Sequence, residues 1–176
     1  MDLPRFEDVR EAAVRIRPLV HRTPVLTCAT LDRRAGARLF FKCENFQKVG
    51  AFKFRGACNA VFSLEAADAA RGVATHSSGN HAQALALAAR LRGVPAHIVM
   101  PENAPGVKRE AVAGYGGRIR FCSPTLSARE AALEAVVAET GANFVHPYND
   151  PRVIAGQGTA ALELLEEAGD LDAIVV

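Results

Sequence analysis

The strongest constraint on the fold is a regular alternation of short apolar runs with helical stretches between residues 72 and 146. The apolar runs have the composition of β-strands, and each helical stretch is closed by the glycine that is common at a helix C-terminus. This order predicts an α/β fold, a parallel sheet with helices on both faces and ligands at the carboxyl ends of its strands. The expected strands are "GVATH" (72–76), "AHIVM" (96–100), "RIRFC" (118–122) and "NFVH" (143–146).

Further elements are expected on both sides of this run. Apolar residues at helical spacing predict a helix from Phe6, and "ARLFFK" (37–42) has the pattern of a strand. Helices are also predicted from about Ala51 to Ala67 and over 151–169, and "LDAIVV" (171–176) is typical of a buried parallel strand. A buried strand is normally followed by further structure, so we expect the chain to be a truncated part of a longer protein.

Composition excludes several classes of protein. The net charge of +2 is small for 176 residues, and with two tyrosines and no tryptophan the chain lacks the pattern of a nucleic-acid-binding surface. The four cysteines are widely spaced and form no C-x-x-C pair, which argues against a zinc site or a disulfide framework and favours a reducing cytoplasm. The first twenty residues contain no apolar stretch long enough for a signal peptide or a membrane span, so we expect no membrane association.

The stretch "THSSGNHAQ" (75–83) joins an expected strand to an expected helix. It places free backbone N–H groups, two hydroxyls and an amide at the positive end of a helix dipole, which favours an anion. Gly79 would let the backbone approach a carboxylate or phosphate without a Cβ in the way. The alternative is structural, because Ser78 or Asn80 could simply cap the helix.

Other catalytic signatures are missing. The segment 50–56 lacks the Gly-Lys-Ser/Thr ending of a P-loop, and no G-x-G-x-x-G follows a strand. Ser78 is not in a G-x-S-x-G elbow, which argues against a hydrolase. His76 and His81 are five residues apart without an H-E-x-x-H pattern, so a capping or packing role is favoured over a metal pair and no metal ligands are assigned.

Lys53 lies between Phe52 and Phe54, near an expected helix start and just beyond Gly50. A lysine in such a place is ordinarily solvated, with its aliphatic stem on apolar surface. The aromatic neighbours favour a second interpretation, in which burial lowers the lysine pKa and leaves a neutral amine. A neutral lysine can attack an aldehyde and hold it as a Schiff base.

Lys53 and the "SSGNH" loop together resemble the pyridoxal-phosphate-dependent serine/threonine dehydratase and serine racemase family, which is tryptophan-synthase-β-like (fold type II). The similar stretches occur in order along the whole chain. They are "HRTPVL" (21–26), "KCENFQKVGAFKFRGA" (42–57), "SSGNHAQALA" (77–86), "VMPENAP" (99–105) and "HPYNDPRVIAGQGT" (146–159).

The resemblance implies a role for each matching residue. The Schiff-base lysine of the family falls on Lys53, Phe52 should lie near one face of the cofactor ring, and Asn80 should bond the ring hydroxyl. The loop Ser77, Ser78, Gly79, Asn80 and His81 should hold the substrate carboxylate. In a dehydratase the freed amine of Lys53 removes the α-proton, the β-hydroxyl leaves, and a 2-oxo acid and ammonia are released.

Two residues give conflicting indications of the reaction. Ser78 matches the serine that acts as a second acid/base in racemases, whereas Tyr148 stands where animal racemases have asparagine and is more like the dehydratases. We favour a dehydratase acting on threonine, serine or 3-hydroxyaspartate, with a serine racemase or a dual enzyme as the nearest alternative. A non-catalytic amino-acid-binding module and a β-replacement enzyme of the cysteine-synthase group remain open, although His81 and "AGQGT" (155–159) argue against the latter.

The resemblance also implies a domain division and partners. Residues 72–146 should form a small α/β domain, and residues 1–71 and 147–176 should be parts of a larger pyridoxal-phosphate-binding domain. A homodimer is expected. The glycine-rich cup for the cofactor phosphate, the partner of the pyridine nitrogen and the Mg²⁺ site of the racemases should all follow residue 176.

Overall fold

The computed structural model describes residues 3–176 and contains a four-stranded parallel sheet, order β5-β4-β3-β6, and a short antiparallel pair. The sheet strands are β3 (Val73–His76), β4 (Ala96–Pro101), β5 (Arg118–Cys122) and β6 (Asn143–Phe144); the pair is β1 (Val25–Leu26) and β2 (Phe41–Lys42). The α-helices are α1 (Phe6–Ile16), α2 (Ala29–Ala35), α3 (Lys53–Phe62), α4 (Ala66–Ala70), α5 (Asn80–Arg92), α6 (Gly106–Gly114), α7 (Leu126–Thr140) and α8 (Pro151–Ala168). Two 3-10 turns, η1 (Glu44–Phe46) and η2 (Lys48–Gly50), precede α3.

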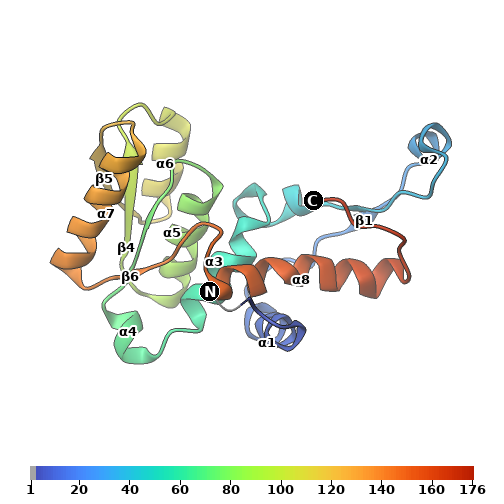
Figure 1. Cartoon of the computed structure of the whole chain (residues 1–176), viewed down its shortest axis with the longest axis horizontal. Helices are drawn as coiled ribbons and strands as arrows, with labels where there is room; N and C mark the ends of the chain where they lie inside the picture. The colour runs from blue at the N-terminus through green and yellow to red at the C-terminus, as the bar shows by residue number, and fades with distance from the viewer. Residues whose placement is uncertain (1–2) are drawn as a thin grey trace.

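The predicted α/β alternation with helices on both faces of a parallel sheet is confirmed (Figure 1). Successive side chains of β3 point to opposite faces because the strand period is two. Val73 therefore belongs to the core that contains α5, whereas Ala74 packs with Leu133 and Val136 of α7. Figure 1 shows α7 on one side of the sheet and α5 on the other.

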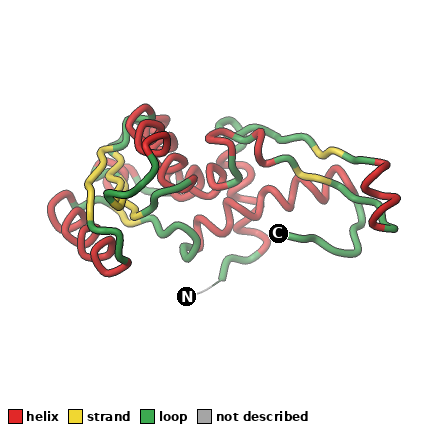
Figure 2. The backbone as a smooth tube through the Cα atoms, turned by 90° about the horizontal axis from the view of Figure 1, so that it is seen from above, coloured by secondary structure: helices red, strands yellow, loops and turns green. Residues whose placement is uncertain are grey.

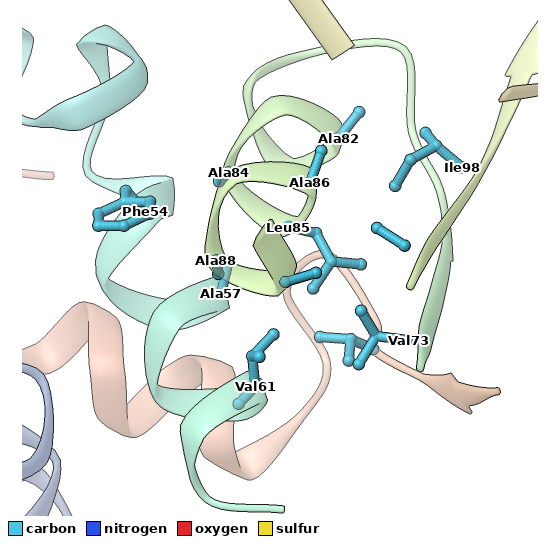
Figure 3. Close-up of a cluster of buried hydrophobic side chains, with 14 of the residues drawn as sticks. Phe54, Ala57, Val61, Val73, Ala82, Ala84, Leu85, Ala86, Ala88 and Ile98 are labelled. Atoms are coloured by element: carbon cyan, nitrogen blue, oxygen red, sulfur yellow. The ribbon is translucent and has the colours of Figure 1, made fainter. Parts of the chain in front are cut away.

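Helix α5 is buried on almost every face because it lies between the sheet and α3. Its alanines have no exposed surface or almost none, and such small side chains let two helices approach closely. Figure 3 shows Phe54 and Val61 of α3 on one side of α5, with Val73 and Ile98 of the sheet on the other. One continuous core thus joins α3 to the sheet, and the predicted domain division at residues 71/72 and 146/147 stays a prediction.

Helices α3 and α8 cross with their backbones in contact. A Cβ on Gly156 would lie 2.7 Å from the Arg55 carbonyl oxygen and from Gly56 Cα, so only glycine fits at the crossing. Asn59 of α3 donates a hydrogen bond to the Arg152 carbonyl oxygen of α8 at 2.7 Å. Figure 2 shows that an arm carrying β1, β2 and α2 extends beyond this crossing.

The predicted helix over 51–67 is wrong, because the structure ends α3 at Phe62 and begins the separate α4 at Ala66. The guanidinium of Arg92 in α5 donates hydrogen bonds to the carbonyl oxygens of Val61 and Leu64. These bonds satisfy carbonyls at the C-terminal end of α3, and Glu65 then adopts an extended conformation. The contact is tertiary, and local propensity contains no sign of it.

Three strand predictions also need correction. The expected strand at 37–42 is reduced to β2, the expected strand at 143–146 is reduced to β6, and residues 171–176 form no strand. The last segment is exposed and has no strand beside it in residues 3–176 with which to form a ladder, and Figure 1 shows the C-terminus away from the four-stranded sheet. Apolar composition alone cannot form a strand whose backbone groups find no partner.

We predict that Gly156→Ala lowers the free energy of unfolding by about 1 to 3 kcal/mol, because the added methyl group overpacks the crossing of α3 and α8. Urea denaturation monitored by circular dichroism measures the change. Gly114→Ala in α6 is the matched control, since a Cβ there meets no atom within 4 Å and stability should be unchanged or slightly raised. Equal losses in both variants would contradict the close crossing.

Candidate active site

Lys53 is the first residue of α3, and its amine is held against the segment that leads into α8. Nζ donates a hydrogen bond to the Pro147 carbonyl oxygen at 3.0 Å, and the side chain is half-buried. No carboxylate forms an ion pair with Lys53 among residues 3–176. Burial therefore lowers the pKa of Lys53 below its ordinary value. A larger fraction of neutral amine follows, which is the state that attacks a carbonyl group.

The two phenylalanines beside Lys53 lie in different surroundings. The Lys53 ammonium lies 5.1 Å from the centroid of the Phe52 ring, and that ring is 44% exposed. Phe54 is completely buried and points into the core beside α5 (Figure 3). Of the two rings, that of Phe52 alone lies beside the amine. The expectation that aromatic rings on both sides shield the Lys53 amine from water is therefore wrong for Phe54. Helical geometry is the reason, because adjacent residues on a helix do not face the same way.

A sharp turn of the backbone sets the point where α3 begins. Val49 has φ 58° and Gly50 has φ 69°, so two successive residues adopt the left-handed conformation. This conformation is strained for a β-branched residue, and Val49 is the one non-glycine residue with positive φ in the described chain. Strain of this kind persists where the surrounding structure holds it, and it is concentrated at functional sites. Here it turns the chain so that Lys53 opens the helix.

A buried ion cluster anchors α3 on the other side. The guanidinium of Arg55, with no exposed surface, donates to both carboxylate oxygens of Glu44 and of Glu163, each at 2.8 Å. Lys42 Nζ lies 2.7 Å from the Glu163 carboxylate, which balances the charges of the cluster. Burial alone would lower the pKa of Arg55, but hydrogen bonds to the two glutamates outweigh it and hold the pKa above its ordinary value. The cluster joins β2, η1, α3 and α8.

The loop before α5 presents backbone donors to its surroundings. The N–H groups of Ser78, Asn80 and His81 have no hydrogen-bond acceptor within residues 3–176, whereas the Gly79 N–H donates to Ser77 Oγ at 3.3 Å. Free N–H groups at a helix N-terminus attract an anion. This geometry agrees with the carboxylate site expected from the sequence.

The space beside the Gly79 backbone is open. A Cβ at Gly79 would meet only Lys108 Nζ, at 4.0 Å, so the protein itself does not require glycine there. The open space suits a ligand that approaches the backbone. Lys108, in the first turn of α6, also brings a positive charge to the loop, and no motif in the sequence indicated this contact.

His81 links the loop to the segment that holds Lys53. Its buried side chain lies with Nε2 3.3 Å from the Val145 carbonyl oxygen, and Lys53 is bound two residues further along, at Pro147. A carbonyl can only accept, so Nε2 carries the proton and Nδ1 is left without a partner in the described chain. Burial lowers the pKa of His81 to about 4, and the imidazole is neutral at pH 7. Because the ring, including Nδ1, is buried, His81 presents its backbone N–H rather than its imidazole to a substrate.

Aromatic rings line the segment after β6. The imidazole of His146 makes an edge contact with Tyr148 at 4.5 Å between ring centroids, and Nδ1 accepts the N–H groups of Tyr148 and Asn149. Phe144 and His76 extend the row along the sheet. Tyr148 is 69% exposed and follows directly after the carbonyl that binds Lys53. The contacts of His146 thus fix the backbone on which Lys53 depends.

Residues 3–176 contain no group of three or more histidine, cysteine, aspartate or glutamate side chains placed to bind a metal ion. Across the same residues, no helix is long and apolar enough to cross a membrane.

The structure brings the two main predicted features together. Lys53 and the Ser77–His81 loop both attach to the segment Val145–Pro147, and Asn80 is exposed at the start of α5. The roles assigned to Lys53, Phe52, Ser78 and the rest of the loop stay predictions. Sequence reasoning missed the Pro147 carbonyl, Lys108 and the ion cluster of Arg55, because all three depend on contacts between distant segments.

Fold and site together define a class, an α/β protein in which a half-buried lysine and a helix N-terminus with free N–H groups attach to the same short segment. The family model described as "Pyridoxal-phosphate dependent enzyme" matches residues 16–176. The chain therefore belongs to the pyridoxal-phosphate-dependent enzyme family, as the resemblance implied.

Relatives at high identity agree with this assignment. The chain is 58% identical to a β-hydroxyaspartate dehydratase of Paracoccus denitrificans over 99% of its length and 56% of that protein. It is also 58% identical to a serine racemase of Arabidopsis thaliana, over 96% of this chain and 51% of that one. The solved structure of maize serine racemase superposes with a TM-score of 0.95 at 51% identity, covering 97% of this chain and 52% of the other. The chain thus spans about half the length of the curated relatives it matches.

We predict that the protein loses stability as the pH falls from about 6.5 to about 4, because the unfolded chain takes up a proton on His81 that the folded protein resists. The stabilisation is fully present above pH 6.5, and its loss amounts to up to about 3 kcal/mol. Urea denaturation at half-unit pH steps measures it. The charges of Lys53, His146 and Asp150 also affect the pKa of His81. Burial lowers the pKa of His76, His97 and His146 as well, so these three histidines contribute with the same sign.

His81→Gln isolates the contribution of this one side chain, because glutamine does not titrate. The variant should show a shallower fall in unfolding free energy between pH 6.5 and 4 than the wild type. Parallel pH profiles for the two proteins would contradict a buried neutral His81.

Proposed function

We propose that this chain supplies the cofactor-linked lysine and the substrate-carboxylate site of a pyridoxal-phosphate-dependent ammonia-lyase (dehydratase), which converts a hydroxy amino acid to a 2-oxo acid and ammonia. One observation carries the proposal. The half-buried amine of Lys53 is bound to Pro147, on the same short segment to which the anion-binding start of α5 is attached through His81.

The residues present fit the cofactor. An aldehyde requires an amine that can lose its proton. Burial, together with the lack of an ion-paired carboxylate within residues 3–176, gives Lys53 that property. The exposed Phe52 ring and the exposed Asn80 amide are available to a planar, hydroxylated ring. Lys53, Phe52 and Asn80 would hold the group, which when bound acts as an electron sink for the charge that develops at the substrate Cα.

The chain's own residues then have separable roles. The free N–H groups of Ser78, Asn80 and His81 bind the substrate carboxylate and fix the orientation of its Cα. Lys53 Nζ accepts the α-proton as a general base, for which a lowered pKa is needed near neutral pH. Lys108 adds positive charge beside the loop and so favours an anionic substrate.

The proposed substrates are 3-hydroxyaspartate, serine and threonine. A relative at 58% identity is named a β-hydroxyaspartate dehydratase, and another at 53% identity, from Saccharomyces cerevisiae, is named an L-threo-3-hydroxyaspartate ammonia-lyase. Both names describe the elimination chemistry that we propose for this chain.

Serine racemase activity is the second candidate. The observation that favours it is Ser78, whose hydroxyl stands in the loop at the start of α5, together with relatives named as serine racemases. Ser78 would supply the second acid/base on the opposite side of the substrate Cα. Tyr148, exposed beside Pro147, is the feature that favours the dehydratase.

We also propose an oligomeric state and a location. A homodimer follows from the resemblance alone, and light scattering of the purified protein would test it. A cytoplasmic location rests on the spacing of the four cysteines. Any Mg²⁺ would be held by residues outside the chain.

We predict that Lys53→Ala abolishes both 2-oxo acid release and exchange of the substrate α-proton with solvent deuterium, by about 10³-fold or more, because the general base is removed. A coupled oxo-acid assay and NMR measure the two rates with 3-hydroxyaspartate, serine and threonine. Lys48→Ala is the matched control, since the Lys48 ammonium lies beside the ring of Phe54, which is buried in the core, and it should keep both activities.

The same experiment separates the alternatives. Exchange together with D-serine formation and little oxo acid would favour the racemase. Unchanged amino-acid affinity in Lys53→Ala, with no activity in the wild type, would favour the non-catalytic binding module and contradict the proposal.

A further inference from the structure

The "AGQGT" segment of α8 contacts the first turn of α3, and the proposed chemistry gives it no role. Oε1 of Gln157 accepts a hydrogen bond from the backbone N–H of Gly56 at 3.1 Å. Gly56 is three residues after Lys53, so the two lie on the same face of the helix. The side chain of Gln157 is thus one helical turn from the amine.

The first turn of α3 needs a partner from elsewhere. The first N–H groups of a helix have no acceptor within the helix, and a polar side chain at the N-cap usually supplies one. The N-cap of α3 is Phe52, which has no side-chain acceptor. The N–H groups of Phe54 and Arg55 bond to the Ala51 and Phe52 carbonyl oxygens, at 3.3 and 3.0 Å. The Phe52 carbonyl oxygen, which the Gly56 N–H would bond in a regular α-helix, is thus bonded by Arg55, and Gln157 supplies the acceptor for Gly56 from another helix.

The side chain of Gln157 is held firmly in this place. A Cβ on Gly56 would lie 2.7 Å from Gln157 Cδ and from Nε2, so the amide is wedged into the crossing of the helices. Only the oxygen end can accept from an N–H group, which determines the orientation of the amide. Nε2 is then buried without a partner within residues 3–176. A buried donor without a partner is unfavourable. Here the hydrogen bond between Gly56 and Oε1 of Gln157 offsets part of that cost.

Helix α8 and its leading segment therefore hold the start of α3 at two points. Pro147 accepts from Lys53 Nζ, and Gln157 accepts from Gly56 one turn later. We infer that Gln157 is a positioning residue for Lys53, because its bond to the Gly56 N–H holds the first turn of α3 and so keeps the amine half-buried at Pro147. The inference rests on the proposed function in taking Lys53 as the reactive amine.

The test is competitive labelling of the chain with a trace of acetic anhydride between pH 6 and 11, followed by peptide mass spectrometry. Each lysine reports its own rate and titration, and Lys48 is the internal reference. Gln157→Met removes the acceptor at similar length, and Gln157→Asn leaves an amide that is one methylene too short. His81, which lies near Lys53, is neutral throughout this range.

Both variants should reduce the rate of Lys53 relative to Lys48 at pH 7 by about threefold to tenfold, the effect of one lost hydrogen bond. The titration of Lys53 should also move up towards that of an ordinary lysine, because the amine gains solvent. Circular dichroism and thermal unfolding confirm that each variant is folded at the labelling temperature. If Gln157→Met does not fold, Gln157→Asn alone decides the result.

Asn59→Ala is the matched control for packing. It removes another hydrogen bond between α3 and α8, to the Arg152 carbonyl oxygen, but two turns away from Lys53. The inference is upheld if Lys53 labelling in this variant stays within twofold of the wild type. Equal loss in Asn59→Ala and the Gln157 variants would overturn it, as would an activated Lys53 that the Gln157 variants leave unchanged.

The failure of the proposed function has a different result. If Lys53 and Lys48 of the wild type have the same labelling rate and titration, the amine of Lys53 is not activated. That result would contradict both the proposed role of Lys53 and the inference about Gln157. An activated wild-type Lys53 leaves the proposed function standing whatever the Gln157 variants do.

Discussion

The arrangement of this protein depends on one buried cation. Arg55 has no exposed surface, and its guanidinium is shared between Glu44 and Glu163, which lie on segments far apart in the sequence. Taking an arginine out of water is strongly unfavourable unless carboxylates with good geometry surround it. The four short bonds meet that condition, and they can form only when η1, α3 and α8 are all in place. Because Lys53 is two residues before Arg55 in the same helix, the ion cluster also sets the position of Lys53.

The position of the candidate site depends on contacts that several segments make with the start of α3. The left-handed pair Val49 and Gly50 turns the chain into α3, and the glycines at the crossing bring α8 into backbone contact. The segment before α8 then passes close enough for Pro147 to bind the amine of Lys53. His81 attaches α5 to the same segment, so the amine of Lys53 and the free N–H groups at the start of α5 are held in a defined relative position although they belong to different helices.

The sequence predicted the parts of this structure that are periodic or local. Strands and helices between residues 72 and 146 were found because alternation and closing glycines are local signals, and the helix-terminus argument located the loop at Ser78. Two features could not be predicted from the sequence. The break after Phe62 depends on the contact with Arg92, and the lack of strand structure at 171–176 reflects that no strand within residues 3–176 lies beside this segment. The pairing of Lys53 with Pro147 was also out of reach, because 94 residues separate the two.

The central claim is that Lys53 is the residue to which pyridoxal phosphate becomes attached. The most direct measurement is to mix the protein with the cofactor, reduce with borohydride and locate the label by peptide mass spectrometry. The structure predicts a single label on Lys53, because its amine is desolvated and lacks an ion-pair partner in the described chain. A label spread over Lys42, Lys48 and Lys108, with Lys53 not preferred, would contradict the account.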